Sequence, residues 1–293
     1  MDWITKLNEA VSYIEENLTG TVDCGKAAEI AECSTYHFQR MFAYLANTSL
    51  SEYIRRRKMS LAAADLQHGD KVLDAALRYG YESPTAFNRA FKAVHGIAPS
   101  AVKKQGALIK AFPRVSFTVA VTGGTELSYF IAKKESFRIA GISIELDNDL
   151  EKNFAKVPKM WMKAALLGTV KKIASLQNNP SLPGILGVSI PESDDKWSYY
   201  IASATDKDTG HKFSSRVIPA FTWAVFPGEG TNRDIQLLEK RVVTEWLPSS
   251  GYEYDNGPDV EVYLTPDPKH AKYEVWIPVV KKQKMQQSAG KEY

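Results

Sequence analysis

Apolar positions in the first third of the chain recur with the period of amphipathic helices. In STYHFQRMFAYL (34–45), Phe38, Met41 and Phe42 stand at i, i+3 and i+4, which predicts one apolar face turned towards a core. Residues 49–67 continue the helical pattern over a longer stretch that contains neither Gly nor Pro. The pattern therefore predicts an all-helical first domain.

This helical pattern is repeated. SPTAFNRAFKAV (83–94) aligns with residues 34–45 without a gap, and each follows a short Ala-rich helical segment, at 25–31 and 73–80. Each unit therefore predicts a helix, a tight turn and a second helix. At 1.5 Å per residue, the helix over 49–67 would be roughly 28 Å long. It could hold the two outer helices about one DNA turn apart, ~34 Å, on one side of a duplex.

The polar faces of the two repeats also correspond. Gln39 and Arg40 in the first repeat match Asn88 and Arg89 in the second. Arg pairs bidentately with guanine edges, and Gln or Asn pairs with adenine edges. Residues 34–104 hold eleven basic and five acidic residues, a balance of +6 in a chain whose net charge is +3. This excess fits a surface that binds a polyanion.

Two basic clusters, RRRK (55–58) and Lys103–Lys104, would supply phosphate contacts without sequence preference. The alternative is that these charges, and the outward Gln and Arg, form an ordinary solvated helix face. The gapless repeat of both faces favours DNA binding.

The repeats resemble a known family. LSEYIRRRKMSLAAADL, VLDAALRYGYESPTAFNRAFKAVHGIAP and STYHFQRMF resemble the tandem helix-turn-helix domain of the AraC/XylS transcription regulators, over about residues 4–104. The resemblance implies two sets of DNA-binding residues: Tyr36, Gln39 and Arg40 in the first recognition helix, and Thr85, Asn88, Arg89 and Lys92 in the second. Pro84 leaves fewer polar side chains at the start of the second helix, so we expect weaker base readout there.

After a junction at 103–114 the pattern changes to short runs rich in β-branched and aromatic residues. Strands are predicted at 115–121, 137–146, 185–190, 197–205, 221–228, 260–265 and 273–280, and helices around 153–176 and 231–247. In this order they form two strand-helix-strand-strand units. Such units predict an antiparallel sheet with helices on one face, which leaves the other face, or the cleft between the units, for a ligand.

The predicted fold class is α+β multidomain, with an all-α domain at 1–110, an α+β domain at 115–281 and a disordered tail at 282–293. The sequence has no G-x-S-x-G, no H-E-x-x-H and no Gly-rich phosphate loop, so no catalytic site is expected. Its two cysteines allow neither a disulfide framework nor a four-thiolate zinc site. We expect no metal and no cofactor. The lack of an 18-residue apolar run or a signal peptide predicts a cytoplasmic protein with no membrane partner.

One acidic residue stands among many aromatic ones near the end of the chain. Strand alternation puts Glu261 and Tyr263 on one face of their strand, with Val260 and Val262 on the other. A carboxylate among aromatic rings suits a large apolar cation, through charge pairing and cation–π contact. The alternative is that the aromatic residues form the core and Glu261 is solvated.

A second resemblance supports a binding site. FRIAGIS, the VPKMW helix, IPAFTWAVFPGEG, EWLPSSGYEYDNGPDVEVY and YEVWIPV together resemble the GyrI-like effector-binding domain over about 115–281. This domain also occurs in multidrug-sensing regulators. The resemblance implies that Glu261 faces a pocket lined by Trp161, Tyr199, Trp223, Tyr263, Tyr273 and Trp276. Tyr273 and Trp276 have opposite strand parity, so only one of them should point inward.

Together the resemblances imply a bacterial transcription regulator that binds double-stranded promoter DNA and a small hydrophobic effector, neutral or cationic. RNA polymerase is a further expected partner. One alternative is a GyrI-like hydrolase that uses Glu261 as a general base, fused to a DNA-binding domain. A second is a protein-binding module. A DNA-repair alkyl acceptor would need a reactive thiol, and only Cys24 and Cys33 are present.

Overall fold

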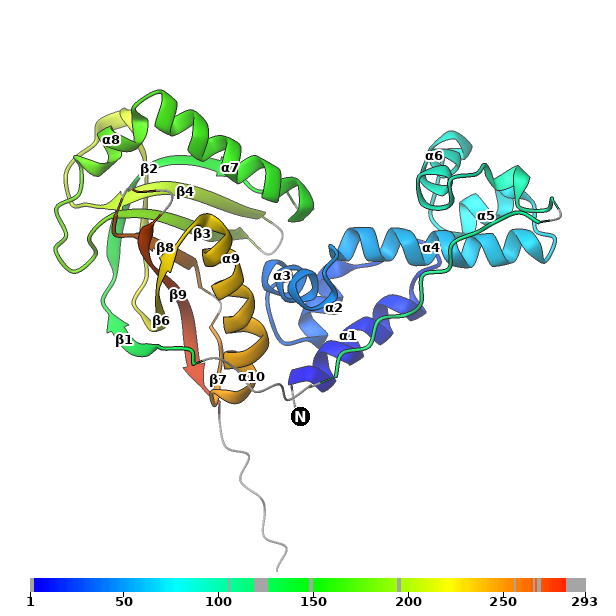
Figure 1. Cartoon of the computed structure of the whole chain (residues 1–293), viewed down its shortest axis with the longest axis horizontal. Coiled ribbons are helices and arrows are strands. Elements are labelled where there is room, and N and C mark those ends of the chain that lie inside the picture. Colours follow the sequence, from blue (N-terminus) through cyan, green and yellow to red (C-terminus); the bar gives the residue numbers. More distant parts are fainter. Residues whose placement is uncertain are drawn as a thin grey trace, which may run out of the picture. The chain divides into compact units, whose positions relative to one another are not determined.

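The chain folds into two compact units, Met1–Gly123 with Asp147–Phe154, and Gly124–Leu146 with Ala155–Tyr293. The first unit is helical and the second is built on a β-sheet (Figure 1). The computed structural model describes residues 3–104, 106–118, 126–147, 150–193, 196–255, 257–265, 267 and 270–282. Apart from Lys282, the tail expected at 282–293 lies outside these residues.

Helices build the first unit. They are α1 (Trp3–Glu16), α2 (Cys24–Ile30), α3 (Thr35–Ala46), α4 (Leu50–Gln67), α5 (Val72–Arg78), α6 (Pro84–His95) and the 3₁₀ helix η1 (Pro99–Ala101). Ser34, Ser49 and Ser83 cap α3, α4 and α6, and each Oγ accepts a bond from the N–H three residues on. Such a cap contributes about 1 kcal/mol. The predicted pair of helix-turn-helix units, α2–α3 and α5–α6, is confirmed.

Two apolar cores lie along α4. Phe38 and Phe42 of α3 are fully buried with residues of α1, α2 and α4, where the rings of Phe42 and Tyr53 lie 5.1 Å apart. Phe87 and Phe91 of α6 are fully buried in the second core with residues of α4 and α5. Each such burial contributes about 1.5–3 kcal/mol to folding. The repeated Phe residues are therefore the anchors of the two units, and α4 joins them.

The segment 106–118 runs along the helical unit (Figure 1). Phe117 is buried in the first core. Asn8 of α1 binds both of its backbone groups, with Nδ2 donating to the carbonyl and Oδ1 accepting from the N–H, each at 2.8 Å. The strand predicted at 115–121 is therefore wrong over its described part, because these residues pair with a helix side chain instead of a neighbouring strand.

Nine strands form the second unit: β1 (Phe130–Lys134), β2 (Phe137–Glu145), β3 (Ile185–Ser193), β4 (Lys196–Ala204), β5 (Ser214–Ile218), β6 (Phe221–Gly230), β7 (Tyr252–Tyr254), β8 (Asp259–Tyr263) and β9 (Ala271–Lys281), counted over the described residues. The order across the sheet is β1-β6-β9-β8-β3-β4-β2-β5, with β7 paired to β9 off this path. The helices are α7 (Leu150–Leu166), α8 (Thr169–Ala174), α9 (Asn232–Arg241) and α10 (Leu247–Ser249), with the 3₁₀ helix η2 (Gly210–Lys212) and the π-helical segment η3 (Val242–Trp246).

The two predicted strand-helix-strand-strand units are present, and every pairing in the sheet is antiparallel. In the first unit β4 lies between β2 and β3, and in the second β9 lies between β6 and β8. The pair β3–β8 joins the two units at the centre, and β1 and β5 extend the edges.

The helices lie on one face of the sheet. Ser203 of β4 donates to the carbonyl of Ile173 in α8 (2.9 Å), and Ile235 of α9 packs in one cluster with Val275 of β9. The opposite face has a core of its own, which includes Trp223 and Trp276 and residues of β1 to β6 and β8. That second face is therefore filled by side chains over the described residues, which makes the helix-covered face the candidate for a ligand site.

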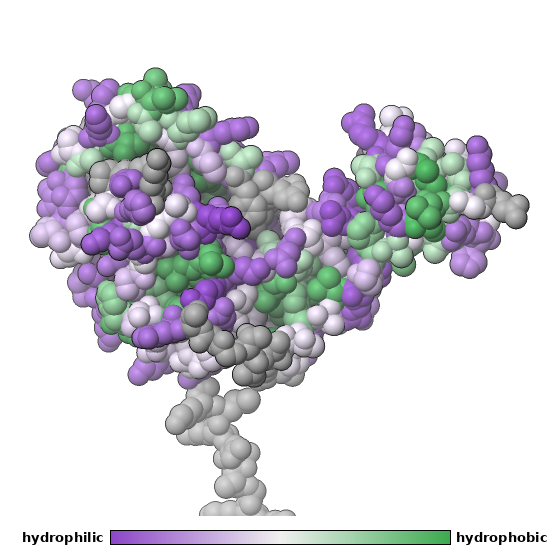
Figure 2. Space-filling model, viewed as in Figure 1, coloured by the Kyte–Doolittle hydropathy of each residue, from purple (hydrophilic) through white to green (hydrophobic). Residues whose placement is uncertain are grey.

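The face shown in Figure 2 is mainly polar with scattered apolar patches. Exposed large apolar side chains include Leu77 on α5, Met162 and Leu166 on α7, and Leu167 just beyond it. No described helix combines the length and apolar character needed to cross a membrane. Within the described part of the chain, no cluster of three or more His, Cys, Asp or Glu side chains could hold a metal ion.

Candidate functional site

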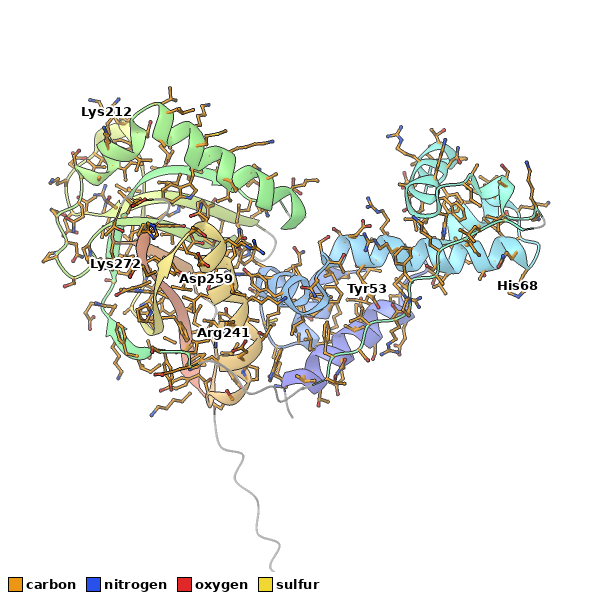
Figure 3. The ribbon with its side chains drawn as sticks, viewed as in Figure 1. Tyr53, His68, Lys212, Arg241, Asp259 and Lys272 are labelled. Carbon is orange, nitrogen blue, oxygen red and sulfur yellow. The ribbon has the colours of Figure 1, made fainter. Side chains whose placement is uncertain are left out.

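Two phenols converge on the carboxylate of Glu261. Tyr199 Oη of β4 donates to Glu261 Oε2 at 3.1 Å, and Tyr263 Oη donates to the same oxygen at 2.8 Å. Trp161 of α7 donates its Nε1 to Tyr199 Oη at 2.9 Å. The reader can locate Glu261 in Figure 3 from Asp259, which is labelled there and lies two residues earlier on β8. A continuous chain of hydrogen bonds therefore runs from α7 across the sheet and orients the carboxylate.

A missing side chain makes this arrangement possible. Gly187 of β3 pairs with Glu261 across the two central strands. A Cβ at residue 187 would stand 2.3 Å from Tyr199 Oη and 2.7 Å from Glu261 Oε2. Burial, together with the charge of Glu261, raises the pKa of Tyr199 and of Tyr263 well above the usual value of 10.0. Both phenols therefore remain protonated donors.

Aromatic rings form the wall beside the carboxylate. The rings of Trp161 and Tyr263 meet edge to face, with centroids 5.1 Å apart and planes at 63°. Both rings are partly exposed, whereas Tyr199 is buried. Ring faces and a carboxylate that are open to solvent on one side can attract a cation by charge and by the ring quadrupole.

Sequence reasoning missed a second carboxylate, Glu239 of α9. This residue is buried on the helix-covered face, and its charge adds to the raised pKa of Tyr199, Tyr263 and Tyr273, for which burial is the main cause. The signal was its spacing, because Glu239 stands four residues after Ile235 in the apolar stripe of α9. The face around Glu261 is therefore more acidic than the sequence predicted.

Of the residues predicted to bind a ligand, the structure brings four together: Glu261, Trp161, Tyr199 and Tyr263. Tyr273 shares their face, since it pairs with Tyr263 in the β8–β9 register, and it packs over Gly228. Of Tyr273 and Trp276, Tyr273 is therefore the one that lies on the face of Glu261.

The placement of Trp223 and Trp276 beside Glu261 is wrong. Trp276 pairs with Val260, the neighbour of Glu261, so strand alternation turns it to the opposite face. There its ring lies 5.7 Å from that of Trp223 in the second core, and its Nε1 donates to Glu274 at 2.7 Å. The two indoles therefore belong to the core on the face of the sheet opposite Glu261.

In the helical unit, α6 presents the predicted residues to solvent. Thr85, Asn88, Arg89 and Lys92 are all exposed. Ser83 and Pro84 fix the start of the helix, and Phe87 and Phe91 fill its buried side. One face of α6 is therefore anchored and the other carries polar side chains that can enter a groove.

Helix α3, the predicted first recognition helix, exposes its predicted DNA-binding residues less than α6 does. Tyr36 and Gln39 are partly exposed, but Arg40 is only 7% exposed. Its guanidinium lies over the ring of Tyr44, 5.6 Å from the centroid, and its Nε donates to Tyr44 Oη at 3.3 Å. The expected outward position of Arg40 is corrected, because the side chain folds along its own helix.

Two residues of the RRRK cluster (55–58) hold the helical unit together, whereas the sequence predicted phosphate contacts for them. Arg57 forms an ion pair with Glu15 of α1 (2.6 Å), and the Lys58 ammonium donates to the carbonyl oxygens of Gly20 and Tyr79. These two cations join α4 to the rest of the helical unit and are not available to phosphates.

The comparisons with known proteins match the helical unit and the sheet unit separately. Residues 130–279 match the family model of the integron-associated effector binding protein, and residues 27–105 match a helix-turn-helix domain. The transcriptional activator AarP of Providencia stuartii is 38% identical over 95 residues, which is 32% of this chain and 70% of AarP. The multiple antibiotic resistance protein MarA of Escherichia coli is 35% identical over 94 residues, 32% of this chain and 74% of MarA. A transcription regulation protein from Staphylococcus aureus aligns with 53% of this chain and 99% of its own, at 23% identity and a TM-score of 0.47.

The fold and the two surfaces define a DNA-binding transcription regulator with a separate effector-binding domain. The chain belongs to the integron-associated effector binding protein family, whose model covers half of it, and its first domain belongs to the AraC-type helix-turn-helix regulators. The GyrI-like character expected of the second domain is confirmed.

Proposed function

We propose that this regulator senses a lipophilic cation at Glu261 and changes its binding to promoter DNA in response. The observation that carries the proposal is the convergence of Tyr199 and Tyr263 on one oxygen of Glu261 beside the Trp161 ring. The two phenols keep the carboxylate in place for a ligand. A cation with aromatic substituents would gain both charge pairing and ring contact there.

On the DNA side, the proposal assigns base contacts to Asn88 and Arg89 and groove or phosphate contacts to Thr85 and Lys92. Their exposure on a well-anchored helix supports this assignment. On α3, Tyr36 and Gln39 are the corresponding candidates, and Arg40 would need to leave Tyr44 to join them. The protein would act in the cytoplasm, where promoter DNA is found, with RNA polymerase as a further partner.

The structure of the site also bears on the hydrolase alternative. Glu261 accepts hydrogen bonds from two phenols whose raised pKa keeps them protonated. Both phenols donate to the same oxygen, so their hydrogen bonds occupy lone pairs with which a general base would take a proton from water. Burial also raises the pKa of Cys33 to about 12, which disfavours a nucleophilic thiol there. Both features favour a sensor.

The test is calorimetric titration with tetraphenylphosphonium, a lipophilic cation, of the wild type, Glu261→Gln and Glu253→Gln. Glu253 is an exposed residue of β7 and serves as the matched control. We expect Glu261→Gln to lose at least tenfold in affinity because the charge is removed at constant shape, and Glu253→Gln to bind as the wild type does. Equal affinity of the wild type and Glu261→Gln would remove Glu261 from the site and overturn the proposal.

The second part of the test is DNA binding. The chain is titrated with DNA from its own upstream region, at two salt concentrations, with and without the cation. We expect salt-dependent binding that prefers this DNA over random DNA, and an affinity that the cation changes in the wild type but not in Glu261→Gln. A cation that binds without changing DNA affinity would contradict the regulatory link.

A further inference from the structure

A cavity of about 440 Å³ lies between α7 and β2, next to the Glu261 cluster, since Ile144 of its lining pairs with Tyr199. Its lining is Ile142, Ser143, Ile144, Lys156, Lys159, Met160, Lys163, Ala164, Leu167 and Thr169. The volume lies within the range of small-molecule pockets, about 300–1,000 Å³. None of the residues of the Glu261 cluster contributes to it.

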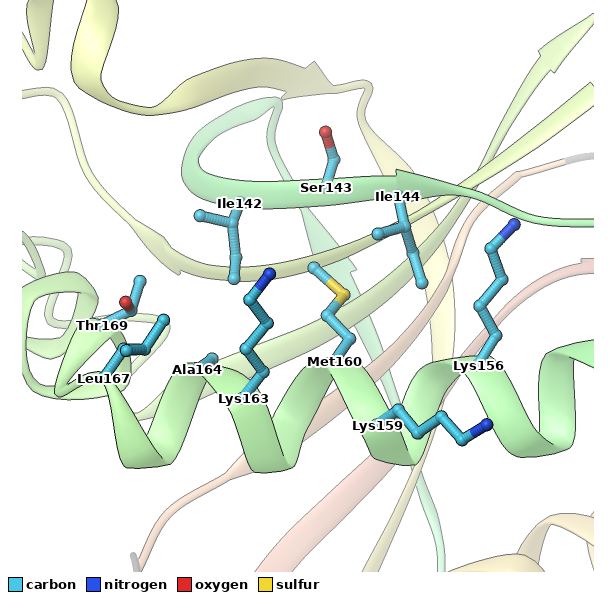
Figure 4. Close-up of a pocket in the computed structure, with 10 residues that line it drawn as sticks. All are labelled: Ile142, Ser143, Ile144, Lys156, Lys159, Met160, Lys163, Ala164, Leu167 and Thr169. Atoms are coloured by element: carbon cyan, nitrogen blue, oxygen red, sulfur yellow. The ribbon is translucent and has the colours of Figure 1, made fainter.

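The walls of this cavity are aliphatic. Ile142 and Ile144 point from β2 towards α7, and Met160 and Ala164 point from α7 towards β2 (Figure 4). Ser143 points away from the helix in the same view. A flexible hydrocarbon chain would find apolar contact on both sides, and Met160 can adapt its shape to it.

The rim of the cavity is basic. Lys156 and Lys163 rise from α7 towards β2 on either side of Met160, and Lys159 lies along the outer side of the helix (Figure 4). Lys156 donates to the carbonyl of Glu145 at 2.6 Å. Over the residues that the structure describes, neither Lys159 nor Lys163 forms a hydrogen bond or an ion pair, and no acidic residue lines the cavity.

Together these features define the chemistry of an occupant. An apolar slot attracts a hydrocarbon tail, and ammonium groups at a lining that contains no acidic residue attract an anionic head. A cation would be repelled by the same rim. We propose that the α7–β2 cavity is a second small-molecule site, which takes an amphipathic anion with an aliphatic tail and a carboxylate or phosphate head held by Lys163 and Lys156.

This site is opposite in charge preference to the Glu261 site and does not depend on it. Helix α7 contributes to both, because Trp161 points towards Tyr199 while Met160 and Ala164 face β2. A ligand in the cavity would therefore contact the helix that carries one wall of the cation site.

The test compares ligands that share one tail on the full chain. Dodecanoate, dodecyl phosphate, dodecyl alcohol and dodecyltrimethylammonium are titrated calorimetrically below their micelle-forming concentrations. We expect the two anions to bind at least tenfold more tightly than the alcohol. The preferred head group is the one with the lower Kd of the two anions. The ammonium ligand should not compete with them for the cavity.

Variants locate the binding. Lys156→Gln/Lys163→Gln should lower anion affinity at least tenfold, and Lys171→Gln, an exposed lysine of α8 outside the lining, should not. Ala164→Leu should fill the slot and abolish anion binding. Tetraphenylphosphonium binding should persist in the double lysine variant, which separates this test from that of the Glu261 site.

Two outcomes would overturn the proposal. One is anion affinity that is unchanged in both the double lysine variant and Ala164→Leu. The other is a double lysine variant that loses DNA affinity while anion affinity is unchanged, which would assign the lysines to nucleic-acid phosphates.

Discussion

The hydrogen atom that Gly187 carries in place of a side chain decides whether Tyr199 can reach Glu261. We expect Gly187→Ala to weaken tetraphenylphosphonium binding at least tenfold, because the new methyl group would push both polar groups apart. Forcing a methyl group into a packed site also lowers the free energy of unfolding by about 1–3 kcal/mol. Calorimetric titration and urea unfolding measure the two effects.

The second variant in this series is Gly187→Ala/Tyr199→Phe. Removing the phenol oxygen relieves the nearer of the two clashes, so the double variant should regain part of the lost stability. A double variant no more stable than Gly187→Ala would show that the clash with Tyr199 is not the cause.

His95 gives the helical unit a pH dependence. Its Nε2 faces the carbonyl of Met59 (3.0 Å), and its Nδ1 accepts from the N–H of Lys110 (3.2 Å), so the ring is neutral with its proton on Nε2. Burial lowers the pKa of His95 below the usual 6.5. The unfolded chain therefore binds a proton more readily, and stability should fall as the pH drops below about 6.5 towards the lowered pKa.

Hydrogen exchange of the α6 amides between pH 7.5 and 5 measures this effect. In His95→Gln, whose amide can make both bonds but cannot titrate, the loss of protection with falling pH should be smaller than in the wild type. His68→Gln, which changes an exposed histidine, should keep the wild-type dependence. If His95→Gln also keeps the wild-type pH dependence, a group other than His95 causes the loss of protection.

The residues near Glu261 could be predicted only in part. Strand alternation correctly put Glu261 and Tyr263 on one face, since parity is a property of a single strand. It could not say which face Trp223 occupies, because that depends on the register of β6 against β9. Arg40 was misplaced for a related reason: helical periodicity gives a direction from the axis, but a long side chain can fold back along the helix.

Helix α6 has a geometry suited to DNA binding, with one face buried and four polar residues exposed on the other. We expect Arg89→Ala to cost about 1–3 kcal/mol of binding free energy and to relax specificity at one base pair. Arg233→Ala, an exposed arginine of α9, is the control. A loss that is equal on specific and random DNA would make Arg89 a phosphate contact instead.

The segment 106–118 is held to the helices by side chains. We expect Asn8→Ala to release Phe117, because both backbone groups of Phe117 lose their partner. The cost is about 1–3 kcal/mol for buried groups left unpaired. Limited trypsin digestion should then cleave after Arg114 faster than in the wild type. Asn17→Ala is the control, since Asn17 follows α1 directly and its amide donates to the carbonyl of Tyr13 in that helix, and equal rates in Asn8→Ala and Asn17→Ala would contradict the expectation.

Most elements were predictable because their apolar periods are long and are repeated. The edge strands β1 and β5 and the short β7 were missed, because Phe130, Ile131 and Val217 are exposed and give no clean alternation of buried and polar positions. The extended segment 115–118 has the sequence pattern of a strand, because apolar residues alternate there in the same way when one side packs on helices. The local pattern of apolar positions predicts which residues are buried, but not which element covers them.

At the scale of the whole molecule, the length of α4 sets the spacing of the DNA site. Its 18 residues span about 27 Å and connect the cores that anchor α3 and α6. One chain should therefore contact two major-groove segments about one turn apart. Inserting 5 base pairs between them should reduce affinity to that of a single half, because the second segment turns to the far side of the duplex. A gel-shift series checks this, and equal affinity at 0, 5 and 10 inserted pairs would contradict it.

The sheet order has a consequence for the origin of the fold. Read from the centre outwards, β3-β4-β2-β5 on one side mirrors β8-β9-β6-β1 on the other, and Gly187 pairs with Ile201 as Glu261 pairs with Val275. The two halves are thus related by an approximate two-fold axis through the β3–β8 pair, which is the geometry of an isologous homodimer. An ancestral half-length chain could have formed this sheet from two copies. In such a dimer, residues 187 and 261 would have been the same amino acid, so the centre could not have held one carboxylate alone. Within one chain the two positions can differ, and here residue 187 is glycine while residue 261 carries the single charge at the centre of the sheet.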